Sequence, residues 1–194
     1  MDSHSSELTI NNFELLSHLA QKLSLSHPCG ESNVSHLCLL ICSLKTADMK
    51  KLESKIDIAA PAQKVWDTMT GPDTYKEWVN VAWPGSYYTG KWKKGENIKF
   101  LSPSNEGTLA TLVECKPGEF VLAEHIAVLK SDGTEDRDSK EAKSWIGTTE
   151  AYTFREKDGR TELKTEMKVE PEWEAMLGDG WPKALAKLKE ICER

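Results

Sequence analysis

Two glutamates on strongly alternating segments are the side chains of this chain that are best suited to acid–base chemistry. Glu124 is two residues from Leu122, and Glu150 is two residues from Tyr152. Because side chains alternate across a strand, each carboxyl shares a face with an apolar or aromatic neighbour. An unpaired charge is costly to bury, so such a group pairs, takes up a proton or meets a ligand. The alternative is that either strand shifts by one residue near an edge, which exposes its glutamate to water.

A histidine next to the first glutamate is a weaker candidate. His125 lies on the opposite face of its strand from Glu124 and has no triad partner in the sequence, so we expect a structural or exposed histidine. The chain contains no HExxH motif, no GxSxG motif, no phosphate-binding glycine loop and no EF-hand loop. We therefore assign no catalytic residue.

Metal-capable side chains gather in one early segment: His27, Cys29, His36, Cys38 and Cys42. Their spacing fits no standard zinc module, and we expect neither a metal ion nor a cofactor. The five cysteines of the chain form an odd set without a CxxC pair. That pattern argues against a disulfide framework and favours a reducing cytoplasm.

The last quarter of the chain predicts a strand followed by a long helix. Residues 161–170 alternate apolar and charged side chains, as in an antiparallel strand with one face in water. Residues 173–193 then follow helical spacing, with Trp181, Leu185 and Leu188 on one stripe. A helix of that length is about 30 Å long, enough to lie across a whole domain.

The preceding part predicts a strand, two short helices and a series of strands. The first strand covers residues 52–58, and Pro61 favours the start of a helix directly after it. A second short helix carries Tyr75 and Trp78 on one face. Further strands are expected, separated by turn residues, at 86–90, 98–101, 108–115, 120–129, 145–155 and 161–170.

Residues 1–48 differ in composition from the rest, because they are rich in Ser, Leu, His and Cys and lack sustained strand alternation. Residues 13–25 fit one weak amphipathic helix. The apolar run 37–44 is too short to span a bilayer and lies too far along the chain for a signal peptide. We expect a poorly ordered or weakly helical N-terminal extension over residues 1–48 and the functional domain over residues 49–194.

The charge balance limits the classes of partner. The net charge is −6, without the basic excess that binding to a phosphate backbone requires, so we expect no nucleic-acid partner. The lysines at 91, 93 and 94 are interpreted as a solvated strand edge. We expect no membrane span and a cytoplasmic protein.

Four motifs, taken in order, carry a resemblance to a known family: residues 58–66 (IAAPAQKVW), 75–78 (YKEW), 92–96 (WKKGE) and 180–189 (GWPKALAKLK). From about residue 51 to residue 193 the chain resembles the activator of heat-shock-protein-90 ATPase homologue-like branch of the SRPBCC superfamily, which includes the START and birch-pollen-allergen proteins. The resemblance implies an α+β helix-grip fold. In that fold a curved antiparallel sheet of about seven strands wraps around the long C-terminal helix, two short helices follow strand 1, and a cavity lies between sheet and helix.

We therefore predict a protein that binds an apolar or amphipathic small molecule and has no assigned catalytic chemistry. The predicted lining of the cavity is Tyr87, Phe100, Leu122, Glu124, Glu150, Tyr152, Met167, Leu185 and Leu188. One alternative is an enzyme of the cyclase or hydrolase kind that uses a cavity carboxylate as acid or base. Another is an interaction module that modulates a chaperone or another ATPase and so has a protein partner. Two buried carboxyls facing one space favour the enzyme, whereas a filled interior with an exposed apolar patch favours the interaction module.

Overall fold

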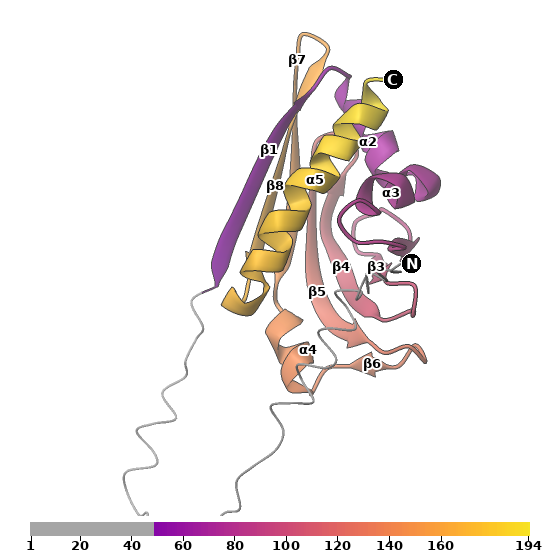
Figure 1. The fold of residues 1–194 in the computed structure, drawn as a ribbon, viewed down its shortest axis with the longest axis vertical. Helices are drawn as coiled ribbons and strands as arrows, with labels where there is room; N and C mark the ends of the chain where they lie inside the picture. Colours follow the sequence, from indigo (N-terminus) through magenta and orange to yellow (C-terminus); the bar gives the residue numbers. More distant parts are fainter. Residues whose placement is uncertain (1–48) are drawn as a thin grey trace, which may run out of the picture. The chain divides into compact units, whose positions relative to one another are not determined.

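The computed structural model describes residues 49–194. The predicted N-terminal extension, with its helix at 13–25 and its metal-capable segment, lies outside the described residues. The elements are, in order, β1 (Lys50–Ile58), α2 (Ala62–Thr70), α3 (Pro72–Val79), β2 (Tyr87–Gly90), β3 (Asn97–Leu101), β4 (Gly107–Lys116), β5 (Phe120–Leu129), β6 (Glu135–Asp136), α4 (Lys140–Trp145), β7 (Thr149–Lys157), β8 (Arg160–Val169), the short 3₁₀ helix η1 (Pro171–Trp173) and α5 (Glu174–Cys192) (Figure 1).

The strands form one antiparallel sheet in the order β1-β8-β7-β5-β4-β3-β2, and the two-residue β6 pairs with β5 beside this path. The first strand of the domain therefore pairs with the last, and the two ends of the sheet are β1 and β2. Helix α5 crosses one face of the sheet (Figure 1). The predicted α+β helix-grip fold, with its seven-strand path and its long C-terminal helix, is confirmed.

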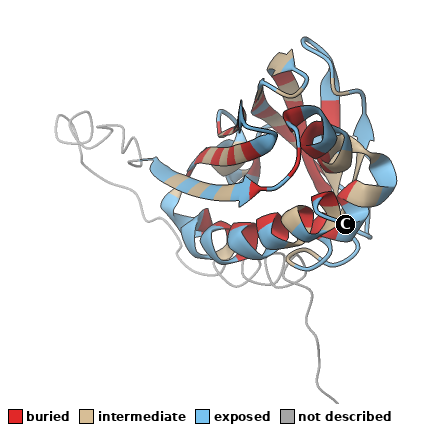
Figure 2. Cartoon of the chain, turned by 90° about the horizontal axis from the view of Figure 1, so that it is seen from above, coloured by how far each residue is buried: buried red, intermediate tan, exposed pale blue. Residues whose placement is uncertain are grey.

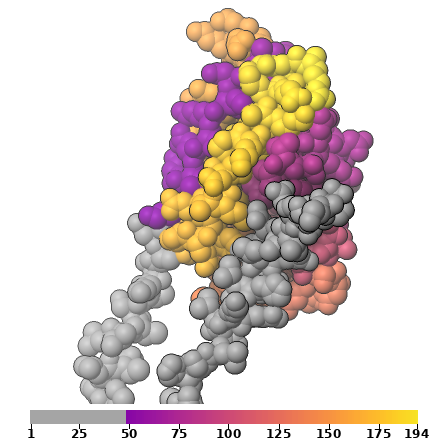
Figure 3. Space-filling model, in the orientation of Figure 1, coloured from indigo at the N-terminus to yellow at the C-terminus, as the bar shows by residue number. Residues whose placement is uncertain are grey.

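Helix α5 presents one continuous stripe to the interior. Its buried residues follow helical spacing: Leu177, Gly180, Trp181, Ala184, Leu185, Leu188 and Cys192. The helix packs against β1 and against α2 and α3, which lie beside it on the same face of the molecule (Figure 3). A Cβ atom at Gly180 would lie 2.6 Å from Trp83 Cζ2, so glycine is required for Trp83 to reach the helix. None of the helices in residues 49–194 is long and apolar enough to cross a membrane.

The two short helices extend this layer beside α5. Pro61 precedes α2, and Gly71 separates α2 from α3, as expected from the sequence. The indole N–H of Trp78 in α3 donates a hydrogen bond of 3.1 Å to the carbonyl of Met69 in α2. The two helices are thereby joined by a buried contact as well as by their short connection.

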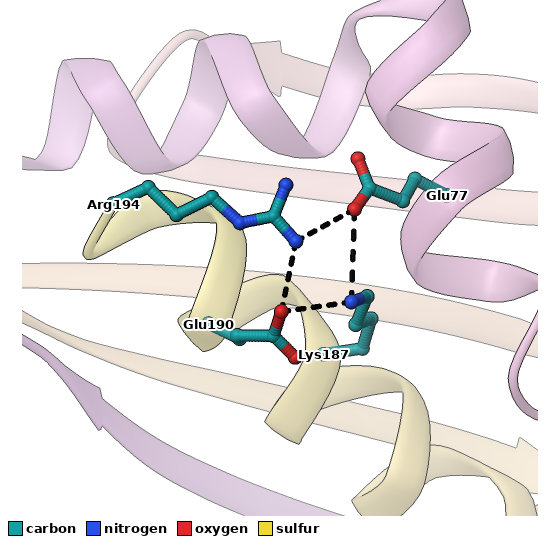
Figure 4. A network of polar contacts seen from close by, with 4 residues as sticks. All are labelled: Glu77, Lys187, Glu190 and Arg194. Atoms are coloured by element: carbon teal, nitrogen blue, oxygen red, sulfur yellow. Dashed lines mark hydrogen bonds and ion pairs between the residues drawn. The ribbon is translucent and has the colours of Figure 1, made fainter.

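Charged side chains join α3 to the end of α5 at the surface (Figure 4). An Arg194 guanidinium nitrogen lies 2.8 Å from Glu77 and 2.8 Å from Glu190, and Lys187 lies 2.9 Å from Glu190. Lys187 also approaches Glu77, at 3.6 Å. The hydrogen bonds from Arg194 and Lys187 lower the pKa of Glu190. Glu77, Glu190 and Arg194 are exposed and Lys187 is half-buried, so we assign the network an orienting role rather than a large share of the stability.

Burial alternates along most strands (Figure 2). The pairing of β4 with β5 contains two bulges. Leu109 pairs with Ala127 and Ala110 pairs with His125, so Ile126 is the extra residue of the first bulge. The second bulge leaves Val113 without a partner in β5, and its side chain is exposed. Bulges of this kind re-aim the side chains on either side of them.

The predicted strand over residues 145–155 is wrong at its start. Residues 140–145 form α4, and β7 begins at Thr149. The Ser139 hydroxyl accepts a hydrogen bond of 3.0 Å from the amide of Ala142, which makes Ser139 the N-cap of α4. The cap and the helix-forming residues after it override the β propensity of Trp145, and the backbone becomes extended again at Ile146.

Candidate functional site

Three buried polar side chains meet on the face of the sheet that carries α5. Glu150 and Tyr152 are two residues apart on β7, and His125 lies on the neighbouring strand β5. Their exposed fractions are 7 %, 3 % and 3 %. The Tyr152 hydroxyl donates a hydrogen bond to Glu150 Oε1, and His125 Nε2 lies 3.8 Å from Glu150 Oε2. The site therefore contains a carboxylate with one donor and an imidazole beside it.

The imidazole of His125 has no hydrogen-bond partner among the described residues. Both ring nitrogens are buried, and the contact with Glu150 is longer than a hydrogen bond. A buried polar group without a partner costs about 1–3 kcal/mol, so native proteins retain few of them without a reason. His125 is consequently available to donate to, or accept from, a group that enters the site.

Aromatic rings surround this polar cluster. The His125 ring lies between Phe100, at a centroid distance of 6.0 Å, and Trp145, at 5.4 Å. Trp145 packs in turn on Trp173 at 5.0 Å, and Tyr152 packs on Trp181 of α5 at 5.9 Å. Because these surroundings are apolar and have a lower dielectric constant than water, electrostatic contacts within the cluster are stronger than the same contacts in water.

A fourth polar side chain, Tyr75 of α3, interacts electrostatically with Glu150. Burial raises the pKa of the Tyr75 hydroxyl above its usual value of 10, and the Glu150 carboxylate raises it further. Tyr75 therefore stays protonated at neutral pH. Its ring packs on Trp78 and on Tyr88, with centroids 5.2 Å and 4.9 Å away.

Trp92 provides a second buried donor without a partner among residues 49–194. Its indole nitrogen is buried and makes no hydrogen bond there, and its ring lies 6.1 Å from Phe100. The Phe100 ring thus packs against both the His125 imidazole and the Trp92 indole. Both polar groups adjoin the same half-buried ring.

Most of the predicted lining residues lie toward this interior. Glu150 of β7 is directly opposite Met167 of β8, and the Trp181 indole N–H contacts the Met167 sulfur at 2.9 Å. Leu185 and Leu188 belong to the buried stripe of α5. Phe100, Glu150 and Tyr152 form part of the cluster described above. Their assignment to a ligand site remains a prediction.

Leu122 and Glu124 do not lie on this face, and the expectation that they point inward is wrong. Glu124 is exposed and Leu122 is half-buried, whereas Val121, Ala123 and His125 between and beside them are buried. Strand β5 carries apolar residues on both faces, so alternation alone does not select the inner one. The inner face carries the smaller side chains, and Ala123 lies directly opposite Glu150 in the sheet.

Tyr87 is also misplaced in the predicted lining. It pairs with Leu101, and its hydroxyl donates a hydrogen bond of 2.6 Å to Asn105 Oδ1 at the surface. The next residue, Tyr88, pairs with Phe100 and packs against Tyr75. The inward tyrosine of β2 is therefore Tyr88, because adjacent residues of a strand lie on opposite faces.

The sequence contained a signal for His125 that its neighbour obscured. Val121, Ala123 and His125 repeat every second residue, and such an apolar repeat marks a buried face. The strand predicted over residues 145–155 includes Trp145, and the sequence pattern does not predict that its ring lies beside the histidine. Because Glu124 lies on the outer face, the two inward carboxyls that would favour an enzyme are not present together.

The chemistry open to the cluster is hydrogen bonding and proton transfer by Glu150, His125 and the two tyrosines Tyr75 and Tyr152. Within residues 49–194, no group of three or more His, Cys, Asp or Glu side chains is placed to hold a metal ion. The cluster thus offers one carboxylate, one imidazole and two hydroxyls inside an aromatic enclosure. Such a mixture of apolar walls and a few placed polar groups is typical of sites for small molecules.

Comparison with known proteins agrees with the fold. The family model described as "Activator of Hsp90 ATPase homolog 1-like protein" matches residues 59–193. Protein MLL2253 from Mesorhizobium loti is similar in structure, with a TM-score of 0.58 and 14 % identity, covering 73 % of this chain and 96 % of that one. The Aha1 dimer from Colwellia psychrerythraea has a TM-score of 0.56 and 19 % identity, covering 75 % and 97 %.

CalU16 from Micromonospora echinospora is a third similar structure, with a TM-score of 0.52 and 16 % identity, covering 74 % of this chain and 76 % of that one. No curated protein sequence matches the chain. At these identities the similarity of the structures concerns the fold alone.

Proposed function

Since the chain belongs to the Activator of Hsp90 ATPase homolog 1-like family, whose fold is of a ligand-binding type, we propose that it binds an apolar or amphipathic small molecule at the cluster of Glu150, Tyr152 and His125. One observation carries the proposal. The His125 imidazole is buried beside a carboxylate, and neither of its nitrogens has a hydrogen-bond partner within residues 49–194. A ligand with one polar group would satisfy it.

The aromatic side chains around the polar cluster indicate the chemistry of the remainder of the ligand. Phe100, Trp145 and Trp181 offer ring faces and edges around the polar cluster. Aromatic side chains of this kind bind planar apolar groups through large contact areas. The ligand is therefore a mainly apolar, preferably aromatic molecule whose single hydroxyl, carbonyl or carboxyl group reaches His125.

Access to the cluster is proposed to lie past the two rings that flank the histidine. Phe100 and Trp145 are both half-buried, and both pack directly on His125. The exposed side chain of Ile146 follows Trp145 at the end of α4. A rotation of either ring about its side-chain bonds would bring His125 into contact with a molecule at the surface.

The test is binding measured by tryptophan fluorescence with a panel of fatty acids, flavonoids and polyketide-like aromatic compounds. We expect His125→Phe to weaken the binding of amphipathic compounds about tenfold or more, which corresponds to 1.4 kcal/mol. Glu124→Gln on the outer face of the same strand is the matched control and should leave affinity unchanged. If no compound binds the parent protein, or if both variants bind as the parent does, the proposed site is refuted.

The contact between His125 and Glu150 favours a second candidate, an enzyme that uses these groups as acid and base. General acid–base catalysis typically contributes 10²- to 10⁴-fold to a rate. Each compound of the panel is therefore followed by mass during the titration. Conversion by the parent protein that Glu150→Gln abolishes and Glu124→Gln preserves would replace the binding role with a catalytic one.

We further propose a cytoplasmic location without nucleic-acid partners. Cys115 and Cys192 are both free cysteines, which is the usual state in a reducing compartment. The net charge of −6 disfavours association with a polyanion. Fractionation of the host cell followed by immunodetection tests the location.

A further inference from the structure

The backbones of two neighbouring strands hold His125 and Glu150 in place. The His125 amide donates a hydrogen bond of 3.0 Å to the Thr148 carbonyl, and the His125 carbonyl accepts one of 2.9 Å from the Gly147 amide. Glu150 follows Thr148 by two residues and pairs with Ala123 in the ladder between β5 and β7. A ligand therefore meets two side chains whose starting points are already fixed relative to each other.

One carboxyl oxygen of Glu150 is occupied, and the other faces the imidazole. The Tyr152 hydroxyl donates a hydrogen bond to Oε1. Among residues 49–194, Oε2 accepts no hydrogen bond, and it lies 3.8 Å from His125 Nε2. Because hydrogen bonds in such a site are about 2.8 Å long, a single ligand oxygen can reach both atoms at once.

An oxygen in that position has to donate one hydrogen bond and accept another. When Glu150 is ionised, it accepts and the imidazole donates through its Nε2–H group. When the proton lies on the carboxyl group instead, the carboxyl donates and Nε2 accepts. A hydroxyl group serves either arrangement, because it carries one hydrogen and two lone pairs. A carbonyl or ether oxygen only accepts, so it leaves one of the two buried groups unpaired.

The charges around the site disfavour a ligand carboxylate. No Lys or Arg of residues 49–194 forms an ion pair with Glu150. The rings that pack on the cluster belong to Phe100, Trp145 and Trp181. A ligand carboxylate would therefore compete with Glu150 for the imidazole, the one group of the cluster that can carry a positive charge. A buried charge without a partner is costly.

We infer that the ligand carries a neutral hydroxyl group on an aromatic body, and that this hydroxyl bridges Glu150 Oε2 and His125 Nε2. The inference rests on the proposed function, because it takes the cluster to be the binding site. Of the hydroxyl, carbonyl and carboxyl groups that could reach His125, it selects the hydroxyl. Glu150 and His125 then determine specificity together, and they select phenols and other aromatic alcohols over acids and ethers of the same shape.

The test uses four naphthalene compounds that differ in one substituent: 2-naphthol, 2-methoxynaphthalene, 2-naphthoate and naphthalene itself. Equilibrium dialysis against the full chain at neutral pH measures their dissociation constants. We expect 2-naphthol to bind about tenfold or more tightly than the ether and the acid, because a site that hydrogen-bonds a hydroxyl rejects analogues without one.

Two variants assign this preference to the pair. Glu150→Gln keeps the shape of the side chain, removes its charge and adds an N–H donor, so it should bind 2-naphthoate about tenfold more tightly than the parent protein does. Such a gain of affinity does not arise from damage to the fold. His125→Phe should weaken the binding of 2-naphthol about tenfold and change that of naphthalene by about twofold or less. Glu124→Gln, the same change on the outer face, is the matched control and should leave all four affinities unchanged.

The outcomes separate this inference from the proposed function. If neither these compounds nor the fatty acids, flavonoids and polyketide-like compounds bind, the proposed function fails and the inference fails with it. The site stands and the bridging hydroxyl alone is overturned if 2-naphthol binds no more tightly than its ether, or if 2-naphthoate binds most tightly. A preference for 2-naphthol that is unchanged in both Glu150→Gln and His125→Phe would also overturn it, because another group would then bind the hydroxyl.

Discussion

Glu150 Oε2 and His125 Nε2 face each other at 3.8 Å across neighbouring strands, which is too far for a hydrogen bond. The Tyr152 hydroxyl donates a hydrogen bond to the other carboxylate oxygen of Glu150, and the rings of Phe100 and Trp145 pack against the imidazole. The histidine is thus positioned by packing, while its hydrogen-bonding capacity stays unused within the described domain.

Replacing this histidine with an apolar ring should stabilise the fold. His125→Phe removes a buried polar group without a partner and keeps an aromatic side chain between Phe100 and Trp145. We expect the free energy of unfolding to rise by about 1 kcal/mol or more, while ligand affinity falls. Denaturant unfolding measures the first quantity. A loss of stability greater than about 1 kcal/mol would show that the imidazole makes a contact that matters to the fold.

The hydroxyl of Tyr152 should contribute more to the free energy of unfolding than the hydroxyl of Tyr87. Tyr152→Phe leaves the buried Glu150 carboxylate without its donor, so we expect a loss of about 1–3 kcal/mol in the free energy of unfolding. Tyr87→Phe removes a hydrogen bond to Asn105 at the surface and should cost about 0.5 kcal/mol or less. Equal costs for the two variants would contradict the buried position of the carboxylate.

The buried stripe of α5 is tested by truncating one leucine. Leu188 has no exposed surface, so Leu188→Ala should lower the free energy of unfolding by about 2–5 kcal/mol. Lys183→Ala, on the exposed side of the same helix, is the control and should change it by about 0.5 kcal/mol or less. A change below about 1 kcal/mol for Leu188→Ala would indicate that the stripe is loosely packed at this point.

The buried Tyr75 predicts a loss of stability at high pH. Burial and the Glu150 charge raise the pKa of Tyr75 in the folded protein, whereas in the unfolded chain it is about 10. The stabilisation that the folded protein gains from the neutral, buried Tyr75 hydroxyl is fully present below pH 10. It is lost as the pH rises further, because only the unfolded chain then releases the proton.

Tyr75→Phe should therefore flatten the fall in unfolding free energy above about pH 10. Glu150→Gln leaves burial, the largest cause of the raised pKa, in place, so it should give the same slope as the parent protein. Denaturant unfolding at a series of pH values measures the slopes. The same slope in Tyr75→Phe as in the parent protein would mean that this hydroxyl titrates freely with solvent.

A fragment of residues 49–194 should fold without the preceding residues. Within the part of the chain that the structure describes, the strand pairs lie between Lys50 and Val169, and the matched family region begins at residue 59. We expect the fragment to melt within a few degrees of the full chain when both are followed by circular dichroism. An insoluble fragment, or one without a cooperative transition, would place part of the core before Met49.

The sequence allowed the frame of the domain to be predicted where one face of an element is clearly apolar. The alternation of β8 and the helical spacing of α5 each admit one arrangement, and both were correct. Strand β5 was different, because Leu122 and Ile126 on one face are as apolar as Val121 and Ala127 on the other. The choice between such faces depends on which neighbours the strand meets.

The errors in the candidate site have the same physical origin. Tyr87 and Tyr88 are identical side chains on opposite faces, and only their pairing with β3 shows which one meets Phe100. The bulge at Ile126 changes the register next to His125, and a bulge has no signature in hydrophobic periodicity. Helix α4 brings Trp145 to the histidine through a contact between segments that are distant in the sequence.

The pairing of β1 with β8 has a consequence for the synthesis of the protein. Lys50 bonds with a strand that ends about 120 residues later, at Val169. At the usual rate of about 5–20 residues per second, β1 leaves the ribosome roughly 6–24 s before its partner exists. During that interval the inner face of β1, with Leu52 and Ile56, has neither β8 nor α5 to cover it. Nascent chains stalled before β8 should be cut by protease within β1, and chains released after α5 should resist, so the domain closes only when its last helix has been made.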